Sequence, residues 1–145
     1  CLAPDFNMMK TLVCFLFCFA LANTAYCQKK QLDYQYFREG KTYYAFSLFS
    51  DPTNAPGALL LDFTTKSKFN KIEKISVTAG SIELKLKFKV RTDSIQSDNT
   101  EQRSYPVVFN AKDIAEKQLS CDGQITFKLD NGESYTLPFN ACLIK

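Results

Sequence analysis

The sequence predicts a mostly β protein: a two-layer antiparallel β-sandwich of six or seven strands with one short helix. From Lys41 onward, apolar residues recur with a period of two, which is typical of strands that bury one face. Clusters of Gly, Pro, Asn, Asp and Ser separate these runs, and strands do not alternate with long helices. A small closed β-barrel is the alternative architecture for such a pattern.

Residues 8–27 have the three parts of a secretory signal peptide. Lys10 supplies the positive charge, Thr11–Ala22 is apolar, and Asn23–Cys27 is small and more polar. The apolar run is shorter than the roughly 20 residues that a membrane-spanning helix needs. The bulky Tyr26 before the cysteine disfavours a lipid anchor. We therefore expect an exported protein, periplasmic or secreted.

Removal of the signal peptide would leave residues 28–145, which we expect to form one mature β-sandwich domain without a membrane span. Residues 1–7 have no signal character and precede two methionines, so we expect them to be a gene-call extension. Cleavage is expected after Cys27, with Ala22 as the alternative.

The composition of residues 28–145 excludes several classes of site. This segment has no His, Trp or Met, so Ser-His-Asp or Cys-His catalysis and imidazole metal sites are excluded, and we expect no cofactor. The five glycines are scattered among turns and form no phosphate-binding loop. The net charge of +3 is too mild to predict a nucleic-acid partner.

The first strands are expected at Thr42–Phe49 and Ala58–Thr64, with a weaker candidate at Leu32–Phe37. A dense cluster of turn formers, residues 50–57, separates the two main strands. Three consecutive leucines, residues 59–61, indicate a strand that is apolar on both faces, as in a sheet interior.

The clearest alternation is the segment 82–91, which we expect to be one strand with a wet face. Its apolar residues are Ile82, Leu84, Leu86, Phe88 and Val90, and charged residues stand between them. An Ala79-Gly80 turn would pair this strand with the preceding segment and set Val77 opposite Ile82.

A polar stretch, Thr92–Ser104, is longer than an ordinary hairpin loop and is expected to be either functional or mobile. Strand character resumes at Tyr105–Phe109. Asn110 is a suitable N-cap with an acid three positions on, which predicts a short helix near 111–119.

The last hairpin can be predicted to its register. A three-residue loop, Asp130-Asn131-Gly132, sets Phe127 opposite Tyr135 and Ile125 opposite Leu137, so that all four share the core face.

Cys121 and Cys142 are the two cysteines that remain after Cys27, and in an oxidising compartment we expect them to form a disulfide. The predicted hairpin register places Cys121 opposite Ala141, one residue away from Cys142. A β-bulge at Pro138 would reconcile the two.

Two surfaces are candidates for binding. Basic residues on the wet face of the segment 82–91 can meet an anionic partner, helped by Lys66, Lys68, Lys71 and Lys74, although a merely solvated face is the simpler interpretation. The basic row consists of Lys85, Lys87, Lys89 and Arg91. An aromatic group can line an apolar site, although core packing accounts for most of it. It consists of Tyr34, Tyr36, Phe37, Tyr43, Tyr44, Phe46 and Phe49.

The functional prediction is an exported binding or structural protein of the periplasm or cell envelope, with an envelope protein or an anionic glycan as partner. The alternative is a small carboxylate-dependent hydrolase acting on envelope or extracellular glycans, because two acids suffice for that chemistry. A pocket that brings two carboxylates together would favour the hydrolase.

Overall fold

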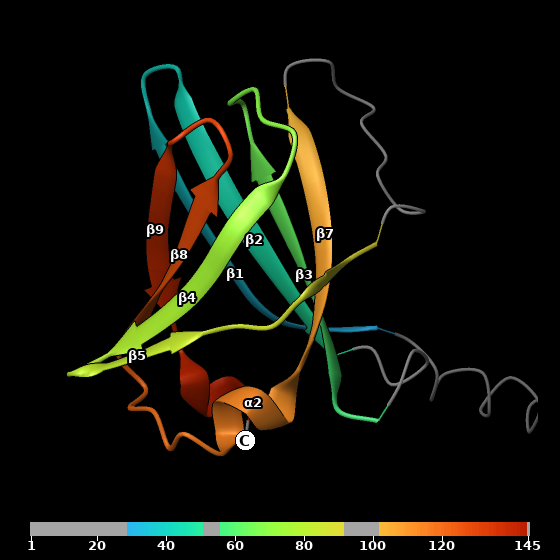
Figure 1. Ribbon diagram of the computed structural model, residues 1–145, viewed down its shortest axis with the longest axis vertical. Helices are drawn as coiled ribbons and strands as arrows, with labels where there is room; N and C mark the ends of the chain where they lie inside the picture. Colours follow the sequence, from blue (N-terminus) through green and yellow to red (C-terminus); the bar gives the residue numbers. More distant parts are fainter. Residues whose placement is uncertain (1–28, 51–55, 92–101, 145) are drawn as a thin grey trace, which may run out of the picture.

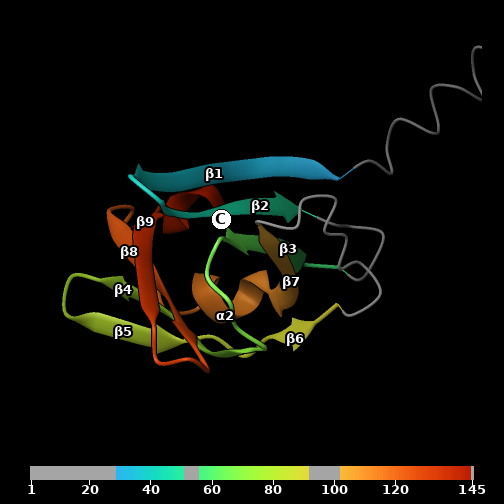
Figure 2. The ribbon, with the colours of Figure 1, turned by 90° about the horizontal axis from the view of Figure 1, so that it is seen from above.

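The computed structural model describes residues 29–50, 56–91 and 102–144, and these form two antiparallel sheets packed face to face (Figures 1 and 2). One sheet has the strand order β1-β2-β3-β7-β6 and the other the order β5-β4-β8-β9. Neither sheet closes on itself, so the predicted sandwich is confirmed and the closed barrel is wrong. The predicted signal peptide, residues 1–7 and positions 92–101 of the polar stretch lie outside the described residues.

The strands of the larger sheet are β1 (Lys30–Glu39), β2 (Thr42–Ser50), β3 (Ala58–Thr65), β6 (Lys89–Val90) and β7 (Arg103–Asn110). Those of the smaller sheet are β4 (Ile72–Ala79), β5 (Ile82–Lys85), β8 (Gly123–Leu129) and β9 (Ser134–Phe139). The weaker N-terminal candidate is therefore a full strand. The three leucines of β3 are all buried, as expected for a strand between β2 and β7.

The core lies between the sheets and is rich in aromatic rings that pack against one another. Phe63 of β3 and Phe127 of β8 have ring centroids 4.4 Å apart, and Phe46 of β2 lies 6.2 Å from Phe127. All three side chains are fully buried. Burial of such large rings supplies much of the apolar area that holds one sheet on the other.

The register of the last hairpin is confirmed: Phe127 pairs with Tyr135 and Ile125 with Leu137. Gly132, the third loop residue, has φ of +88°, a left-handed conformation that glycine adopts without strain. Ile125, Phe127 and Leu137 are buried and Tyr135 is half-buried, so these side chains share the core face as predicted.

The segment 82–91 is not one strand. β5 ends at Lys85, and the chain then crosses from the edge of the smaller sheet to the edge of the larger one, where β6 pairs with β7 (Figure 1). Leu86, in the crossing segment, is 2 % exposed and donates its backbone N–H to the Ile75 carbonyl at 2.9 Å. The alternation of buried and exposed residues continues through the crossing, so the pattern alone does not reveal it.

The predicted turn before β5 is displaced by one residue, which shifts the pairing register by two. Ala79 pairs with Ile82 and Val77 with Leu84, so the loop is Gly80-Ser81. Gly80 has φ of +61°, and a glycine at the first central position suits a type II′ hairpin turn. A shift of two residues leaves each side chain on the same face.

The helix α2 (Ala111–Ala115) is shorter than the predicted 111–119. Asn110 caps it as expected, accepting a hydrogen bond from the Lys112 backbone N–H at 2.9 Å. The chain leaves the helical path at Gln118, which has φ of 49°. Ile114 is 1 % exposed, and the helix closes the lower end of the sandwich in Figure 1.

Cys121 and Cys142 form a disulfide with a Cα separation of 5.0 Å, which is the pairing that the sequence predicts. The expected bulge at Pro138 is wrong, because Gln124 pairs with Pro138 in an uninterrupted register. Pairing instead ends at Phe139, and a 3₁₀ turn, η3 (Ala141–Ile144), carries Cys142 to Cys121. The Asn140 side chain accepts a hydrogen bond from the Cys142 backbone N–H at 2.9 Å.

Candidate anion-binding site

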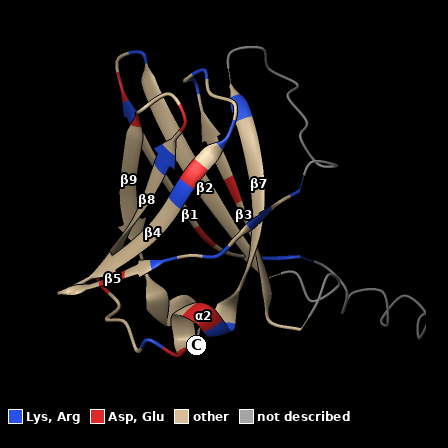
Figure 3. Cartoon of the chain, in the orientation of Figure 1, with Lys and Arg blue, Asp and Glu red and all other residues tan. Residues whose placement is uncertain are grey.

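A hollow of about 900 Å³ opens at the end of the sandwich opposite α2. The β1–β2 turn, the β3–β4 loop and the first residues of β7 meet at this end, and Figure 3 shows Lys and Arg in each of them. The hollow is lined by Lys41, Lys66, Ser67, Lys68, Phe69, Asn70 and Arg103.

The β8–β9 turn fixes the shape of the β3–β4 loop. The Asp130 carboxylate accepts a hydrogen bond from the Asn70 backbone N–H at 3.0 Å. The Asn131 amide donates to the Lys68 carbonyl at 2.9 Å and to the Ser67 hydroxyl at 3.1 Å. The pKa of Asp130 is lowered, chiefly by the backbone N–H of Asn70, so the carboxylate stays ionised in this clamp. Lys66 and Lys68 therefore belong to a loop that the β8–β9 turn holds at Ser67, Lys68 and Asn70.

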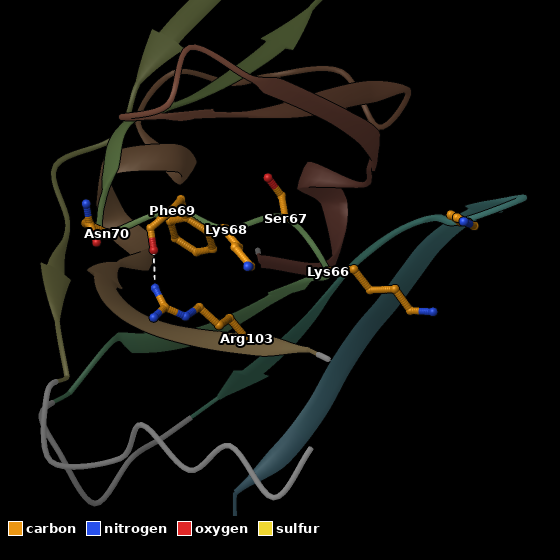
Figure 4. Close-up of a pocket in the computed structure, with 7 residues that line it drawn as sticks. Lys66, Ser67, Lys68, Phe69, Asn70 and Arg103 are labelled. Carbon is orange, nitrogen blue, oxygen red and sulfur yellow. Dashed lines mark hydrogen bonds between the residues drawn. The ribbon is translucent and has the colours of Figure 1, made fainter. Parts of the chain in front are cut away.

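Among the residues that the structure describes, four cationic side chains and no carboxylate line the hollow. The Arg103 guanidinium donates to the Phe69 carbonyl, the dashed contact in Figure 4. Lys68 extends into the space beside Arg103, whereas Lys66 turns away from the other labelled residues (Figure 4). Within the described ranges, none of the four cations has a carboxylate partner at ion-pair distance. A cleft lined by charge of one sign concentrates its potential and attracts ligands of opposite charge.

A smaller hollow of about 200 Å³ adjoins the first and shares Lys41, Lys66 and Ser67 with it. It adds Glu133 and Tyr135. The Tyr135 hydroxyl donates to Glu133 Oε2 at 2.6 Å, and the Ser67 hydroxyl donates to the same oxygen. Hydrogen bonds from these two hydroxyls lower the pKa of Glu133, with that from Ser67 the larger cause.

The predicted basic row does not lie on one strand face. Lys85 ends β5 in the smaller sheet and Lys89 begins β6 in the larger one, so the row follows the crossing between the sheets. Lys85, Lys87 and Lys89 are exposed, and Arg91 is half-buried. Asp113 lies with Lys87 and Lys89 around a neighbouring hollow of about 380 Å³, which weakens the positive field there.

The supporting lysines of the sequence analysis separate in the structure. Lys66 and Lys68 line the large hollow. Lys71 is exposed and is not among the residues that line the hollow. Lys74 forms an ion pair with Glu83 at 3.1 Å on the outer surface of the smaller sheet. The site therefore draws on two of these four lysines.

The aromatic group also divides. Phe46 is in the core, whereas Tyr34, Tyr36 and Phe37 of the edge strand β1 are 45 %, 62 % and 37 % exposed. Tyr43 and Tyr44 point to opposite faces of β2, as adjacent strand residues must: the Tyr43 hydroxyl meets that of Tyr34 at 3.3 Å, and the Tyr44 ring lies 4.5 Å from Tyr135.

Sequence reasoning missed Lys41 and Arg103. Lys41 lies in a two-residue turn and Arg103 near the end of the polar stretch, so neither belongs to a spaced motif. The topology could have found them. β1 and β3 end, and β7 begins, at the same end of one antiparallel sheet, which brings the three segments together.

Other chemistries find little support in the described ranges. Hollows of about 900, 510, 380 and 200 Å³ are each lined by at most one carboxylate there. No group of three or more His, Cys, Asp or Glu side chains suited to a metal ion occurs among the same residues. None of the described helices has the length and apolarity to cross a membrane.

The class of protein that the fold and this site define is a disulfide-bonded antiparallel β-sandwich with a cationic hollow at one end. Comparison with known proteins gives no closer assignment, because no family, curated protein or solved structure matches the chain.

Proposed function

We propose that this is an exported binding protein whose cationic hollow takes an anionic glycan. The observation that carries the proposal is the set of four cations, Lys41, Lys66, Lys68 and Arg103, around a hollow that no carboxylate of the described ranges lines. A volume of about 900 Å³ lies within the usual range for small-molecule sites and suits a few sugar rings.

The neutral groups of the hollow favour a glycan over a nucleic acid. Ser67 and Asn70 offer hydrogen-bonding groups to sugar hydroxyls. Phe69 is 4 % exposed, so the aromatic residue of the hollow offers no face on which a base could stack, as single-strand binding requires. The disulfide supports the exported setting, since such bonds persist in oxidising compartments.

A hydrolase at this site is less well supported. Glycoside hydrolysis needs two carboxyl groups flanking the scissile bond, commonly with the pKa of the acid raised. In the part of the chain that the structure describes, no carboxylate lines the large hollow, and the pKa of Glu133 in the adjoining hollow is lowered. We therefore assign binding rather than cleavage.

The test compares two variants of equal charge change in the processed chain from an exporting host. Lys68→Gln/Arg103→Gln alters the hollow, and Lys85→Gln/Lys87→Gln alters the crossing between the sheets. Affinity for polygalacturonate is measured by calorimetry at fixed salt. We expect the first variant to weaken binding by about tenfold or more and the second by about twofold or less. The reverse order would place the site on the crossing segment, and equal losses would indicate attraction by net charge alone.

A further inference from the structure

The cationic hollow continues into a corner of opposite charge. The adjoining hollow shares Lys41, Lys66 and Ser67 with it and adds Glu133. A ligand that fills both therefore meets cations at one end and a carboxylate at the other.

The Glu133 carboxylate is held in place by its donors. Its Oε2 atom accepts hydrogen bonds from the Ser67 and Tyr135 hydroxyls and from the Asn131 amide at 3.2 Å. The Asn131 side-chain oxygen in turn accepts from the Glu133 backbone N–H at 2.9 Å. The Glu133 side chain remains exposed. Its hydrogen bonds with Ser67, Asn131 and Tyr135 all use Oε2, so these three partners leave Oε1 for a ligand.

A fixed carboxylate beside the cations sorts anions by charge density. A sulfated or phosphorylated polymer carries its charges close together and would bring one of them against Glu133, where like charges repel. A sugar hydroxyl is a hydrogen-bond donor, and an ionised carboxylate can only accept, so a hydroxyl-bearing ring suits this corner.

We propose that the site is specific for carboxylated glycans, with the sugar carboxylate at Lys68 and Arg103 and hydroxyls of the same or the next ring donating to Glu133. The inference rests on the proposed function and deepens it by naming the class of glycan. In this proposal the cations supply the affinity for anionic glycans, and Glu133 selects the carboxylated ones.

The experiment measures the affinity of the full processed chain for polygalacturonate and for heparin at the same ionic strength, by calorimetry. The variant is Glu133→Gln, which keeps the size of the side chain and removes its charge. Glu116→Gln in the turn after α2, at the other end of the molecule, is the control for net charge, since its contact with Lys112 is a long, exposed ion pair of 3.7 Å.

We expect the wild-type chain to prefer polygalacturonate over heparin, and Glu133→Gln to shift the ratio of the two affinities toward heparin by about tenfold, equivalent to about 1.4 kcal/mol. Glu116→Gln should leave the ratio unchanged. Loss of the Glu133 carboxylate can loosen the β3–β4 loop and so alter binding indirectly. The preference of the wild-type chain for polygalacturonate over heparin is therefore the second measurement, since it depends on no variant.

The possible failures are distinguishable. If heparin binds the wild-type chain as well as polygalacturonate, and both depend on Lys68 and Arg103, the proposed function stands and the carboxylate specificity is overturned. The specificity also falls if Glu133→Gln and Glu116→Gln raise both affinities alike. If neither polymer binds, the proposed function itself is overturned.

Discussion

At the residue scale, three tyrosines gather on the outer face of the larger sheet. Tyr34 and Tyr36 of β1 have ring centroids 5.9 Å apart, and the Tyr34 hydroxyl lies 3.3 Å from that of Tyr43 on β2. The hydrogen bond with Tyr34, followed by partial burial, raises the pKa of Tyr43 to about 12. Adjacent strand residues point to opposite faces, which places one of Tyr43 and Tyr44 outside, but this alternation does not predict that two hydroxyls meet there.

Replacement of Tyr34 by Phe should therefore lower the pKa of Tyr43 toward 10. The measurement is a spectrophotometric titration of tyrosinate absorbance. Tyr36→Phe is the comparison, because the charge of Tyr36 is the smallest of the causes that raise the pKa of Tyr43 and its removal should lower that pKa less than the loss of the Tyr34 hydrogen bond. A Tyr43 that titrates at the same pH in the Tyr34→Phe chain would contradict the assignment.

The raised pKa also fixes the sign of a stability change with pH. The folded chain holds the Tyr43 proton more tightly than the unfolded chain, so the stabilisation is present below pH 10 and is lost as the pH rises through about 12. Chemical denaturation across this window should show a steeper loss in the wild-type chain than in Tyr34→Phe. Parallel losses in the two chains would refute the linkage.

At the element scale, a strand or turn was predictable from the sequence where residues close together in the chain determine it. The β8–β9 hairpin was predictable because one loop and four apolar residues fix it. The β4–β5 turn was displaced because Gly80 can serve at either central position of a two-residue turn, and both choices keep the apolar residues on one face. The end of β5 was missed because the alternation of apolar and charged residues indicates which face a side chain occupies. It does not indicate which sheet the backbone joins.

The crossing segment gives a test of this difference. The alternation places Ile82 and Leu86 on the same buried face, but in the structure Ile82 is 43 % exposed and Leu86 is 2 % exposed. Leu86→Ala should lower the free energy of unfolding by about 2–5 kcal/mol, since it leaves a cavity in the core. Ile82→Ala should change it by no more than about 0.5 kcal/mol, as at other surface positions.

Urea denaturation monitored by far-ultraviolet circular dichroism measures both changes. Equal losses in the two variants would mean that the segment is a single strand that lies on the smaller sheet throughout, as the alternation suggests.

At the scale of the whole molecule, the candidate site depends on contacts that no single segment contains. Lys41, Lys66 and Arg103 come from three connections that only the sheet topology brings together. The clamp by Asp130 and Asn131 adds a fourth segment, from the other sheet. Sequence patterns predicted most of the strands, and the composition gives the number of cations. Pairing between strands that are distant in the chain decides which cations become neighbours.

The disulfide acts at the same scale, because it ties η3 to the segment that leads into β8. Replacing Cys121 and Cys142 together by Ser should lower the free energy of unfolding by about 3 kcal/mol, the value expected for a closed loop of about 20 residues. The fold should persist, since Ile125, Phe127 and Leu137 still bury the hairpin.

Thermal denaturation of the oxidised chain and the double variant measures the loss, and near-ultraviolet circular dichroism reports whether packing is kept. A double variant as stable as the oxidised chain would show that the disulfide does not contribute to the free energy of unfolding. Two free thiols in the natively exported protein would remove the bond altogether.

The crossing from β5 to β6 has a consequence for how the sandwich opens. The Leu86 amide is bonded to Ile75 in one sheet and the Arg91 amide to Pro106 in the other, and five residues of one continuous segment connect these two amides. The buried Leu86 side chain anchors one end of this segment in the core, so release of the segment would unpair an edge of both sheets in a single event. We therefore expect native-state hydrogen exchange to give the Leu86 and Arg91 amides the same opening free energy, so that this border of the molecule behaves as one cooperative unit rather than as two independently fraying edges.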